Sequence, residues 1–205
     1  MFQFINNFFN RKRERKKPDP MKYLVVGLGN MGPDYDGTRH NVGFEVVDYL
    51  AEKFNVQFKN DMLGDLAEFK HKGRTIILLK PSTYMNRSGK AVNYWLQKKK
   101  VKNSNLLIVL DDLNLPFGRI KIKPKGKNGG HNGLKDIDQI LGGNLYARLR
   151  VGIGSEFHSG QQVNFVLGKW DSGEKNQLPE IIEKSANAAL SFTTIGINHT
   201  MNEYN

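Results

Sequence analysis

The chain has 205 residues, 39% of them hydrophobic, which is enough for one good-sized core and one domain. Its net charge of +11 and isoelectric point of about 9.7 favour a polyanionic partner such as nucleic acid or an anionic membrane, although a merely basic surface would give the same numbers. The absence of cysteine excludes disulfides, thiolate zinc sites and cysteine nucleophiles, and no apolar run reaches the roughly 20 residues of a membrane span.

Residues 1–20 differ from the rest of the chain, and we expect a disordered leader there and a single domain at 21–205. Residues 1–10 are rich in phenylalanine and residues 11–17 are mostly basic, the reverse of the order in a signal peptide. A short interfacial helix or an extra RNA-binding arm are the alternatives. The leader accounts for +4 of the net charge, so the domain itself is basic at +7.

Strand-like and helix-like segments alternate along the domain. Short apolar or alternating runs predict strands at 22–26, 66–70, 74–79, 106–110, 119–124, 148–153 and 161–167. Apolar residues at helical spacing predict helices at 41–54, at 87–99, from about 131, and at 173–195. This alternation, without internal repeats, predicts one α/β domain with a mixed, mostly parallel sheet flanked by helices on both faces.

Three polar stretches, at 27–30 with 38–41, at 84–86 and at 129–133, lie where a predicted strand ends or a predicted helix begins. In an open α/β sheet those ends meet at one crevice, so the three stretches could share a site. They contain no strong nucleophile and no set of metal ligands. They suit a general base, an activated water and amide donors for an oxyanion.

His40 precedes the first long helix, and Asp111 ends a buried strand. A lone histidine at such a position more often caps a turn, but an aligned carboxylate could fix its tautomer and make it a general base worth about 10²–10⁴ in rate. Asn30, Asn86 and Asn132 could each donate to an oxyanion or serve only a local turn. The sequence leaves open which of the three is the oxyanion donor.

Gly27-x-Gly29-x-x-Gly32 follows the first predicted strand and matches the dinucleotide-binding fingerprint. That fingerprint needs a helix packed at its third glycine, whereas more loop follows Gly32, and the acidic residue expected about 20 positions later falls inside a predicted helix. We therefore expect the glycines to permit close backbone approach and to aim Asn30 into the crevice, rather than to hold a nicotinamide or flavin.

Two later strands carry cations at every second position: Arg119, Lys121 and Lys123 on the first, and Arg148 and Arg150 on the second. A period of two places the cations on one face of a strand and the intervening apolar residues on the other. Lys125 and Lys127 continue the stripe towards a glycine-rich loop at a helix N-terminus. The stripe predicts a phosphate-contacting surface, and a solvated strand face is the alternative.

Taken in order and spacing, the motifs resemble those of bacterial-type peptidyl-tRNA hydrolase from about Met21 to the C-terminal helix. They are VGLGN at 26–30, TRHNVGF at 38–44, KPSTYMNRSG at 80–89, DDLNLP at 111–116, GGHNGL at 129–134 and RLRVGIG at 148–154. The resemblance implies hydrolysis of the ester that joins a peptide to the 3′ end of tRNA. It also implies a monomeric, cytoplasmic enzyme without a metal or other cofactor, whose partner is peptidyl-tRNA.

By the same resemblance, His40 is the general base that activates water and Asp111 holds it in the basic form. Asn30 would help to discriminate N-blocked peptidyl-tRNA from free aminoacyl-tRNA, and Asn86 is a candidate oxyanion donor. The other residues implied in substrate binding are Tyr35, Tyr84, Met85 and Asn132 at the site and, as a clamp on the tRNA 5′-phosphate, Lys123 and Arg150.

The chain departs from the family pattern at Met31, where proline is usual, and at Asp112 and Asn114, where Glu and Asp are common. We expect activity to survive, because none of the three is expected to touch the proposed base or its partner. The main alternative is an RNA-binding protein on the same fold, like the related plant organellar splicing factors, which predicts a damaged catalytic set. A nicotinamide oxidoreductase and a basic domain without chemistry explain fewer of the motifs.

Overall fold

The computed structural model describes residues 18–205, so most of the predicted leader lies outside the described residues. The end of the leader is hydrogen-bonded to the domain. The Asp19 amide donates to the Lys100 carbonyl (3.3 Å), and the Asn105 side-chain amide donates to the Pro20 carbonyl (3.0 Å).

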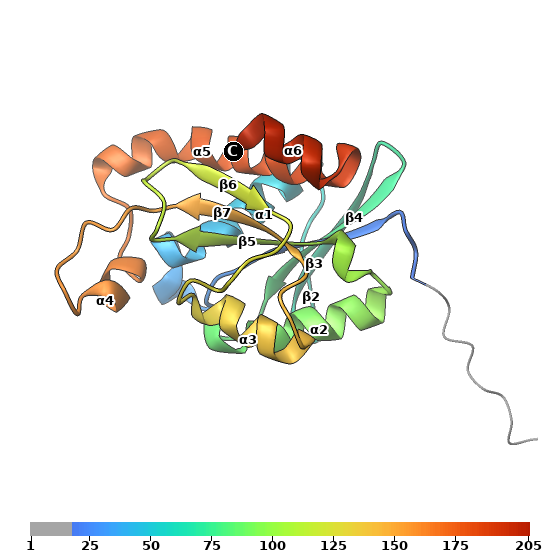
Figure 1. Ribbon diagram of the computed structural model, residues 1–205, viewed down its shortest axis with the longest axis horizontal. Coiled ribbons are helices and arrows are strands. Elements are labelled where there is room, and N and C mark those ends of the chain that lie inside the picture. The colour runs from blue at the N-terminus through green and yellow to red at the C-terminus, as the bar shows by residue number, and fades with distance from the viewer. Residues whose placement is uncertain (1–17) are drawn as a thin grey trace, which may run out of the picture.

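In the described part of the chain, seven strands form one sheet in the order β2-β3-β4-β1-β5-β7-β6 (Figure 1). Their bounds are β1 (Lys22–Gly27), β2 (Lys59–Asp61), β3 (Gly64–His71), β4 (Arg74–Pro81), β5 (Leu106–Asp112), β6 (Ile120–Lys123) and β7 (Ala147–Gly152). The four central strands β4, β1, β5 and β7 run parallel, whereas β2, β3 and β6 join as antiparallel pairs. The predicted mixed sheet is therefore confirmed.

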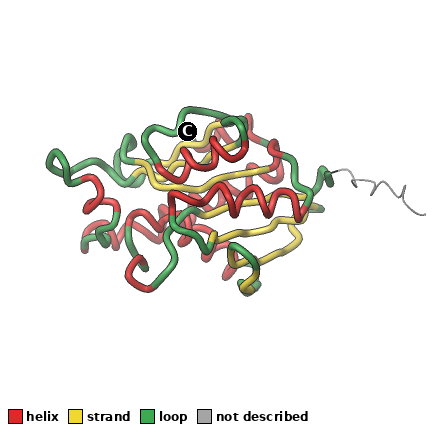
Figure 2. Tube along the Cα trace, turned by 90° about the horizontal axis from the view of Figure 1, so that it is seen from below, coloured by secondary structure: helices red, strands yellow, loops and turns green. Residues whose placement is uncertain are grey.

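Over residues 18–205, six α-helices accompany the sheet: α1 (Val42–Lys53), α2 (Ser88–Lys99), α3 (Asn132–Leu141), α4 (Gln162–Val166), α5 (Ser172–Ile195) and α6 (Ile197–Tyr204). Helices α1, α5 and α6 cover one face of the sheet, and α2 and α3 cover the other (Figures 1 and 2). The prediction of helices on both faces is confirmed. Within residues 18–205, no helix combines the length and hydropathy needed to cross a membrane.

The predicted strand at 161–167 is wrong, because this segment forms the short helix α4. The Phe165 amide donates to the Gln161 carbonyl (3.0 Å) and the Leu167 amide to the Val163 carbonyl (3.1 Å), both with helical spacing. A short apolar run does not by itself distinguish a strand from a helical turn. The strand β2 and the final helix α6 were not predicted.

Strand β5 lies in the middle of the sheet, between β1 and β7, and all seven of its residues are buried. Its sequence is apolar for five residues because both faces of a central parallel strand are covered by helices. The run then ends in Asp111 and Asp112, two carboxylates at the carboxyl end of the strand. This position brings them to the edge where the loops after β1, β4 and β7 also gather.

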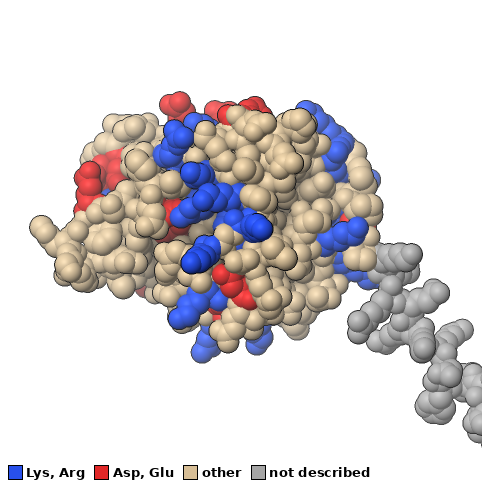
Figure 3. All heavy atoms as spheres, viewed as in Figure 1, with Lys and Arg blue, Asp and Glu red and all other residues tan. Residues whose placement is uncertain are grey.

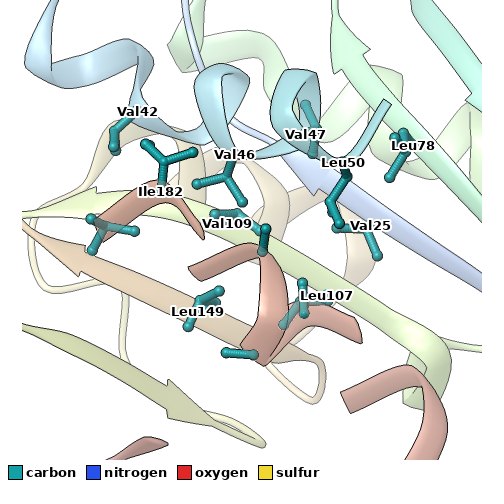
Figure 4. Close-up of a cluster of buried hydrophobic side chains, with 14 of the residues drawn as sticks. Val25, Val42, Val46, Val47, Leu50, Leu78, Leu107, Val109, Leu149 and Ile182 are labelled. Carbon is teal, nitrogen blue, oxygen red and sulfur yellow. The ribbon is translucent and has the colours of Figure 1, made fainter. Parts of the chain in front are cut away.

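Helix α1 packs its apolar side onto β1, β4 and β5, as Figure 4 shows for Val42, Val46 and Leu50 above Val25 and Val109. These five side chains are fully buried, and each contributes about 1.5–3 kcal/mol relative to an exposed position. The packing fixes the start of α1, and with it the short 3₁₀ turn Arg39–Asn41, at the carboxyl end of the sheet.

Gly27 and Gly43 let the start of α1 lie directly against the end of β1. A Cβ on Gly27 would lie 2.1 Å from the Gly43 carbonyl oxygen, and a Cβ on Gly43 would lie 2.5 Å from the Leu28 amide nitrogen. Any side chain at either position would push the helix away. The glycines thus permit the close backbone approach that the sequence predicts.

Candidate active site

A cleft of about 1320 Å³ opens at the carboxyl end of the central strands, and all three polar stretches contribute to its wall. The sequence-predicted residues that line it are Asn30, His40, Tyr84, Met85, Asn86, Asp111, Asn132 and Arg150. Tyr35 and Lys123 lie outside this lining. The segment with α4 and the loop after β5 complete the wall and give the cleft an apolar side, with Leu113, Phe117 and Phe165 among its residues.

One carboxylate oxygen at the base of the cleft contacts two histidines. Oδ1 of Asp111 lies 2.9 Å from Nδ1 of His40 and 3.0 Å from Nε2 of His131. The Asp111 side chain is 2% exposed, whereas His40 and His131 each reach the cleft surface. The structure therefore joins His40 and Asp111, which are 71 residues apart in the sequence, and adds a third group.

The charge of Asp111 decides which nitrogen of His40 carries hydrogen. Burial raises the pKa of Asp111, but the two histidines outweigh it and hold that pKa well below its usual range. An ionised carboxylate only accepts hydrogen bonds, so Nδ1 of His40 is the donor and the lone pair of the neutral ring lies on Nε2. Burial lowers the pKa of His40, yet the charge and hydrogen bond of Asp111 raise it above its ordinary value.

His131 lies in the motif GGHNGL, which gave it no role in the sequence. In the structure it is hydrogen-bonded to Asp111, as His40 is. Its Nδ1 accepts from the Gly133 amide (3.1 Å) and the Leu134 amide (3.3 Å), which caps the N-terminus of α3. Nε2 must then carry the hydrogen that it donates to Asp111. A histidine at a predicted helix start was the available signal for this capping role.

His40, Asp111 and His131 have ligand atoms within 4.8 Å of one another, a spacing that could also suit a metal ion. A histidine that binds metal through Nε2 carries its hydrogen on Nδ1 and donates it onward. Nδ1 of His131 instead faces two backbone N–H donors. The three side chains therefore fit a hydrogen-bonded network better than a metal centre.

The side chain of Asn30 is oriented by its own contacts. Its Oδ1 accepts from the Met85 amide (2.8 Å), so its Nδ2 is the atom left to face the cleft. Asn41 holds the backbone around it, because Asn41 Oδ1 accepts from the Asn30 amide (2.8 Å) and Asn41 Nδ2 donates to the Asn30 carbonyl (3.0 Å). Both asparagines are buried. Asn41 was not predicted as a site residue, although it stands beside His40 in the sequence.

Met85, Asn86 and Asn132 line the same cleft as Asn30. Met85 is 4% exposed, and a Cβ on Gly133 would lie 2.7 Å from its sulfur, so the apolar side chain packs tightly against the start of α3. Asn86 and Asn132 are exposed at the cleft wall. The cleft wall thus carries several side-chain amides together with the imidazole of His40.

The basic stripe lies beside the cleft, on β6, β7 and the loop between β6 and α3. Figure 3 shows a group of Lys and Arg side chains on this face of the molecule. Ile120 and Ile122 are fully buried while Lys121 and Lys123 are partly exposed, as the period of two predicts.

The two arginines of β7 differ from each other. Arg150 lines the cleft and forms an ion pair through Nε with Asp112, one of the residues at which the chain departs from the family pattern. Arg148 is 1% exposed and donates to the carbonyls of Gly126 (2.8 Å) and Asn144 (3.2 Å). The expectation that Arg148 belongs to a phosphate-contacting surface is therefore wrong. Its guanidinium is buried and its hydrogen bonds go to backbone carbonyls of the protein itself.

Comparisons with known sequences and solved structures all identify the same protein family. The family model described as peptidyl-tRNA hydrolase matches residues 24–205. The chain is 51% identical over 185 residues to the peptidyl-tRNA hydrolase of Porphyromonas gingivalis, covering 90% of this chain and 100% of the relative. It is 49% identical over 185 residues to that of Cytophaga hutchinsonii, covering 90% and 98%. A crystal structure of peptidyl-tRNA hydrolase from Acinetobacter baumannii superposes with a TM-score of 0.84 at 36% identity, over 89% of this chain and 94% of the other.

Proposed function

We propose a mechanism by which this protein, a member of the peptidyl-tRNA hydrolase family, hydrolyses the ester that joins a peptide to the 3′ end of tRNA. The family that the motifs predict is thus confirmed, and the roles of individual residues are the proposal. The single observation that carries it is the bond from His40 Nδ1 to Asp111 Oδ1 (2.9 Å), which leaves Nε2 of His40 unprotonated at the cleft. An imidazole in this state is a general base for water.

In the proposed reaction, Nε2 of His40 takes a proton from water while the water oxygen attacks the ester carbonyl carbon. The resulting imidazolium is stabilised by the ionised carboxylate of Asp111. When the tetrahedral intermediate collapses, the bond between the carbonyl carbon and the ribose oxygen breaks, and the imidazolium returns its proton to that oxygen. The products are a free peptide acid and tRNA with its terminal hydroxyl, and every proton is carried by water or by the protein.

Asn30 is proposed to select substrates with a blocked amino group. Its free Nδ2 is a hydrogen-bond donor, and an N-acylated substrate offers the carbonyl oxygen of its acyl group as acceptor. A free aminoacyl-tRNA offers an ammonium group at that place, which has only donors and no acceptor. Loss of a required hydrogen-bond partner in a buried polar site can reject a substrate strongly.

Asn86 is the proposed oxyanion donor and Asn132 lies with it at the cleft wall, and one such donor contributes about 10²–10³ in turnover. Tyr84 and Met85 would line the substrate site. Tyr35, which stands outside the cleft lining, would meet the substrate only at the entrance.

Lys123 and Arg150 are proposed to bind the 5′-phosphate of the tRNA, with the rest of the basic stripe along its backbone. The terminal nitrogens of Arg150 suit this role because the ion pair with Asp112 is made through Nε. We further propose that the enzyme acts as a monomer in the cytoplasm.

Release of the N-acetylated amino acid from N-acetylated aminoacyl-tRNA, compared with release of the amino acid from the unacetylated form, tests the reaction. The proposal predicts rapid cleavage of the acetylated substrate and little enzymatic cleavage of the free one. Binding of both substrates without cleavage of either would favour the RNA-binding alternative. Equal cleavage of both would contradict the role of Asn30.

A further inference from the structure

Arg39, the residue before His40, is a buried cation that the proposed reaction does not use. It is 9% exposed, and all three nitrogens of its guanidinium are bonded within the protein. Nε lies 3.2 Å from Glu174 Oε1 and Nη2 lies 2.6 Å from Glu174 Oε2, the two-point geometry of a strong charge-assisted pair. Arg39 borders the cleft, but its hydrogen-bond donors point towards the chain after β7.

The same arginine binds the segment that follows α4 at several further points. Nη1 donates to the Lys169 carbonyl (3.0 Å) and to the Phe165 carbonyl (3.4 Å). The backbone amide of Arg39 donates to the Gly168 carbonyl (3.0 Å). Every carbonyl at which Arg39 holds this segment thus lies at or just after the carboxyl end of α4.

Two aromatic rings cover the guanidinium. Its central carbon lies 4.5 Å from the centroid of the Phe165 ring and 5.6 Å from that of Trp170. Trp170 in turn donates from Nε1 to Glu45 of α1 (3.2 Å), and Glu174 accepts from the Asp171 amide (2.8 Å) in the cap of α5. Two of the partners of Arg39, Trp170 and Glu174, are therefore connected to the long helices α1 and α5.

Helix α4 is only lightly packed: Phe165 and Val166 touch the core cluster, and the Phe165 ring lies 5.0 Å from that of Phe157. None of its five residues is buried, in contrast to α1, α2, α3 and α5. Yet Gln162, Val163, Phe165 and Val166 all line the cleft. Figure 1 shows α4 at the side of the molecule, away from the layers that sandwich the sheet. A helix with so few buried residues opens by local unfolding more readily than the core, unless other interactions stabilise it.

We infer that Arg39 is a positioning residue that fixes α4 as a wall of the substrate cleft, through Glu174 and the carbonyls after α4. The inference rests on the proposed function, because the substrate is the one that this cleft would hold. Arg39 does not touch the reacting atoms. It connects α4 to the turn that carries His40. The substrate then binds between two elements whose distance and orientation are fixed.

Arg39→Lys keeps the positive charge but loses the two-point bond and the planar group that stacks on the rings. We expect KM for N-acetylated aminoacyl-tRNA to rise about tenfold with kcat within about threefold, the pattern of lost binding rather than lost chemistry. The pH at half-maximal rate should stay unchanged, because Asp111 and His40 are untouched. Glu174→Gln, which keeps the size of the side chain, should move KM in the same direction.

Arg74→Lys is the matched control. Arg74 is also partly buried and donates to backbone carbonyls, those of Lys72 (2.8 Å) and Thr194 (2.9 Å), but it is not part of the cleft wall. This variant should lower the thermal midpoint without changing KM. If Arg39→Lys and Glu174→Gln also leave KM unchanged, or if they move the pH midpoint instead, the inference is overturned.

Hydrogen exchange on the full-length protein gives a readout that needs no turnover. In Arg39→Lys the amides of Phe165 and Leu167, which close the turns of α4, should exchange at least about tenfold faster, while amides of β5 keep their wild-type rates. Unchanged exchange in α4 would refute the inference. A wild-type protein that fails to cleave the substrate would instead contradict the proposed function, and the exchange result would still decide the role of Arg39.

Discussion

Replacing Asp111 with asparagine removes the negative charge between His40 and His131 and keeps the shape of the side chain. The carboxylate lies 2.9 Å from His40 Nδ1, and the centres of the two charged groups are about 4 Å apart once His40 is protonated. At an effective dielectric constant of about 20, that pair is worth about 4 kcal/mol. Since about 1.4 kcal/mol corresponds to a factor of ten, the single-turnover rate should fall by about 10³.

The pH profile gives the same substitution a second, independent outcome. In its proposed role His40 acts as a base only when neutral, so the rate of the wild type should fall as pH drops through the raised pKa of His40. In Asp111→Asn the effect of burial remains and the opposing charge is gone, so the pKa of His40 should drop below its ordinary value of about 6.5. The acid limb of the rate should therefore move to lower pH.

The assay is single-turnover cleavage of N-acetylated aminoacyl-tRNA between about pH 5 and 9, a range that brackets the ordinary histidine pKa. Asp138→Asn is the control, because Asp138 also bonds a buried partner, the Tyr146 hydroxyl (2.7 Å), but does not line the cleft. A near-normal rate in Asp111→Asn, or an acid limb that moves to higher pH, would refute the reasoning.

Three further changes test other parts of the site. His131→Ala removes the second donor to the shared carboxylate oxygen, so the pKa of His40 should rise and the acid limb should move up, and loss of the helix cap should lower the free energy of unfolding by about 1 kcal/mol in a urea titration. Asn41→Ala leaves the buried backbone amide and carbonyl of Asn30 without partners, and we expect a loss of about 2–4 kcal/mol in unfolding free energy together with a lower kcat/KM. Lys123→Gln should raise KM and reduce the slope of log KM against log salt by about 1, and an unchanged slope would remove Lys123 from the phosphate contacts.

The mixed sheet, and the position of the three polar stretches at one edge of it, could be predicted from short hydrophobic patterns in the sequence. The five apolar residues that begin β5 are typical of a central parallel strand, and a carboxylate after such a run must lie at the carboxyl edge of the sheet. The start of α1 lies at the same edge, which brings His40 to Asp111. Alternation of Ile120 and Ile122 with lysines likewise predicted which side chains of β6 are buried.

Orientation within the site could not be predicted, because it depends on contacts between distant segments. The free atom of the Asn30 amide is set by the Met85 backbone, 55 residues away, and the tautomer of His131 is set by the first turn of α3. The burial of Arg148 depends on the path of the loop that passes over it. The short apolar run of α4 fits either a strand or a helix. The hydrogen bonds from Arg39 to this segment could not be predicted from the sequence.

The most direct test of the central claim is single-turnover release from N-acetylated aminoacyl-tRNA by wild type, His40→Ala and the control His71→Ala, whose histidine lies on β3 and does not line the cleft. If Nε2 of His40 activates the attacking water, His40→Ala should lose about 10²–10⁴ in rate, while it still binds tRNA and His71→Ala keeps the wild-type rate. A His40→Ala protein that cleaves at a near wild-type rate would contradict the account.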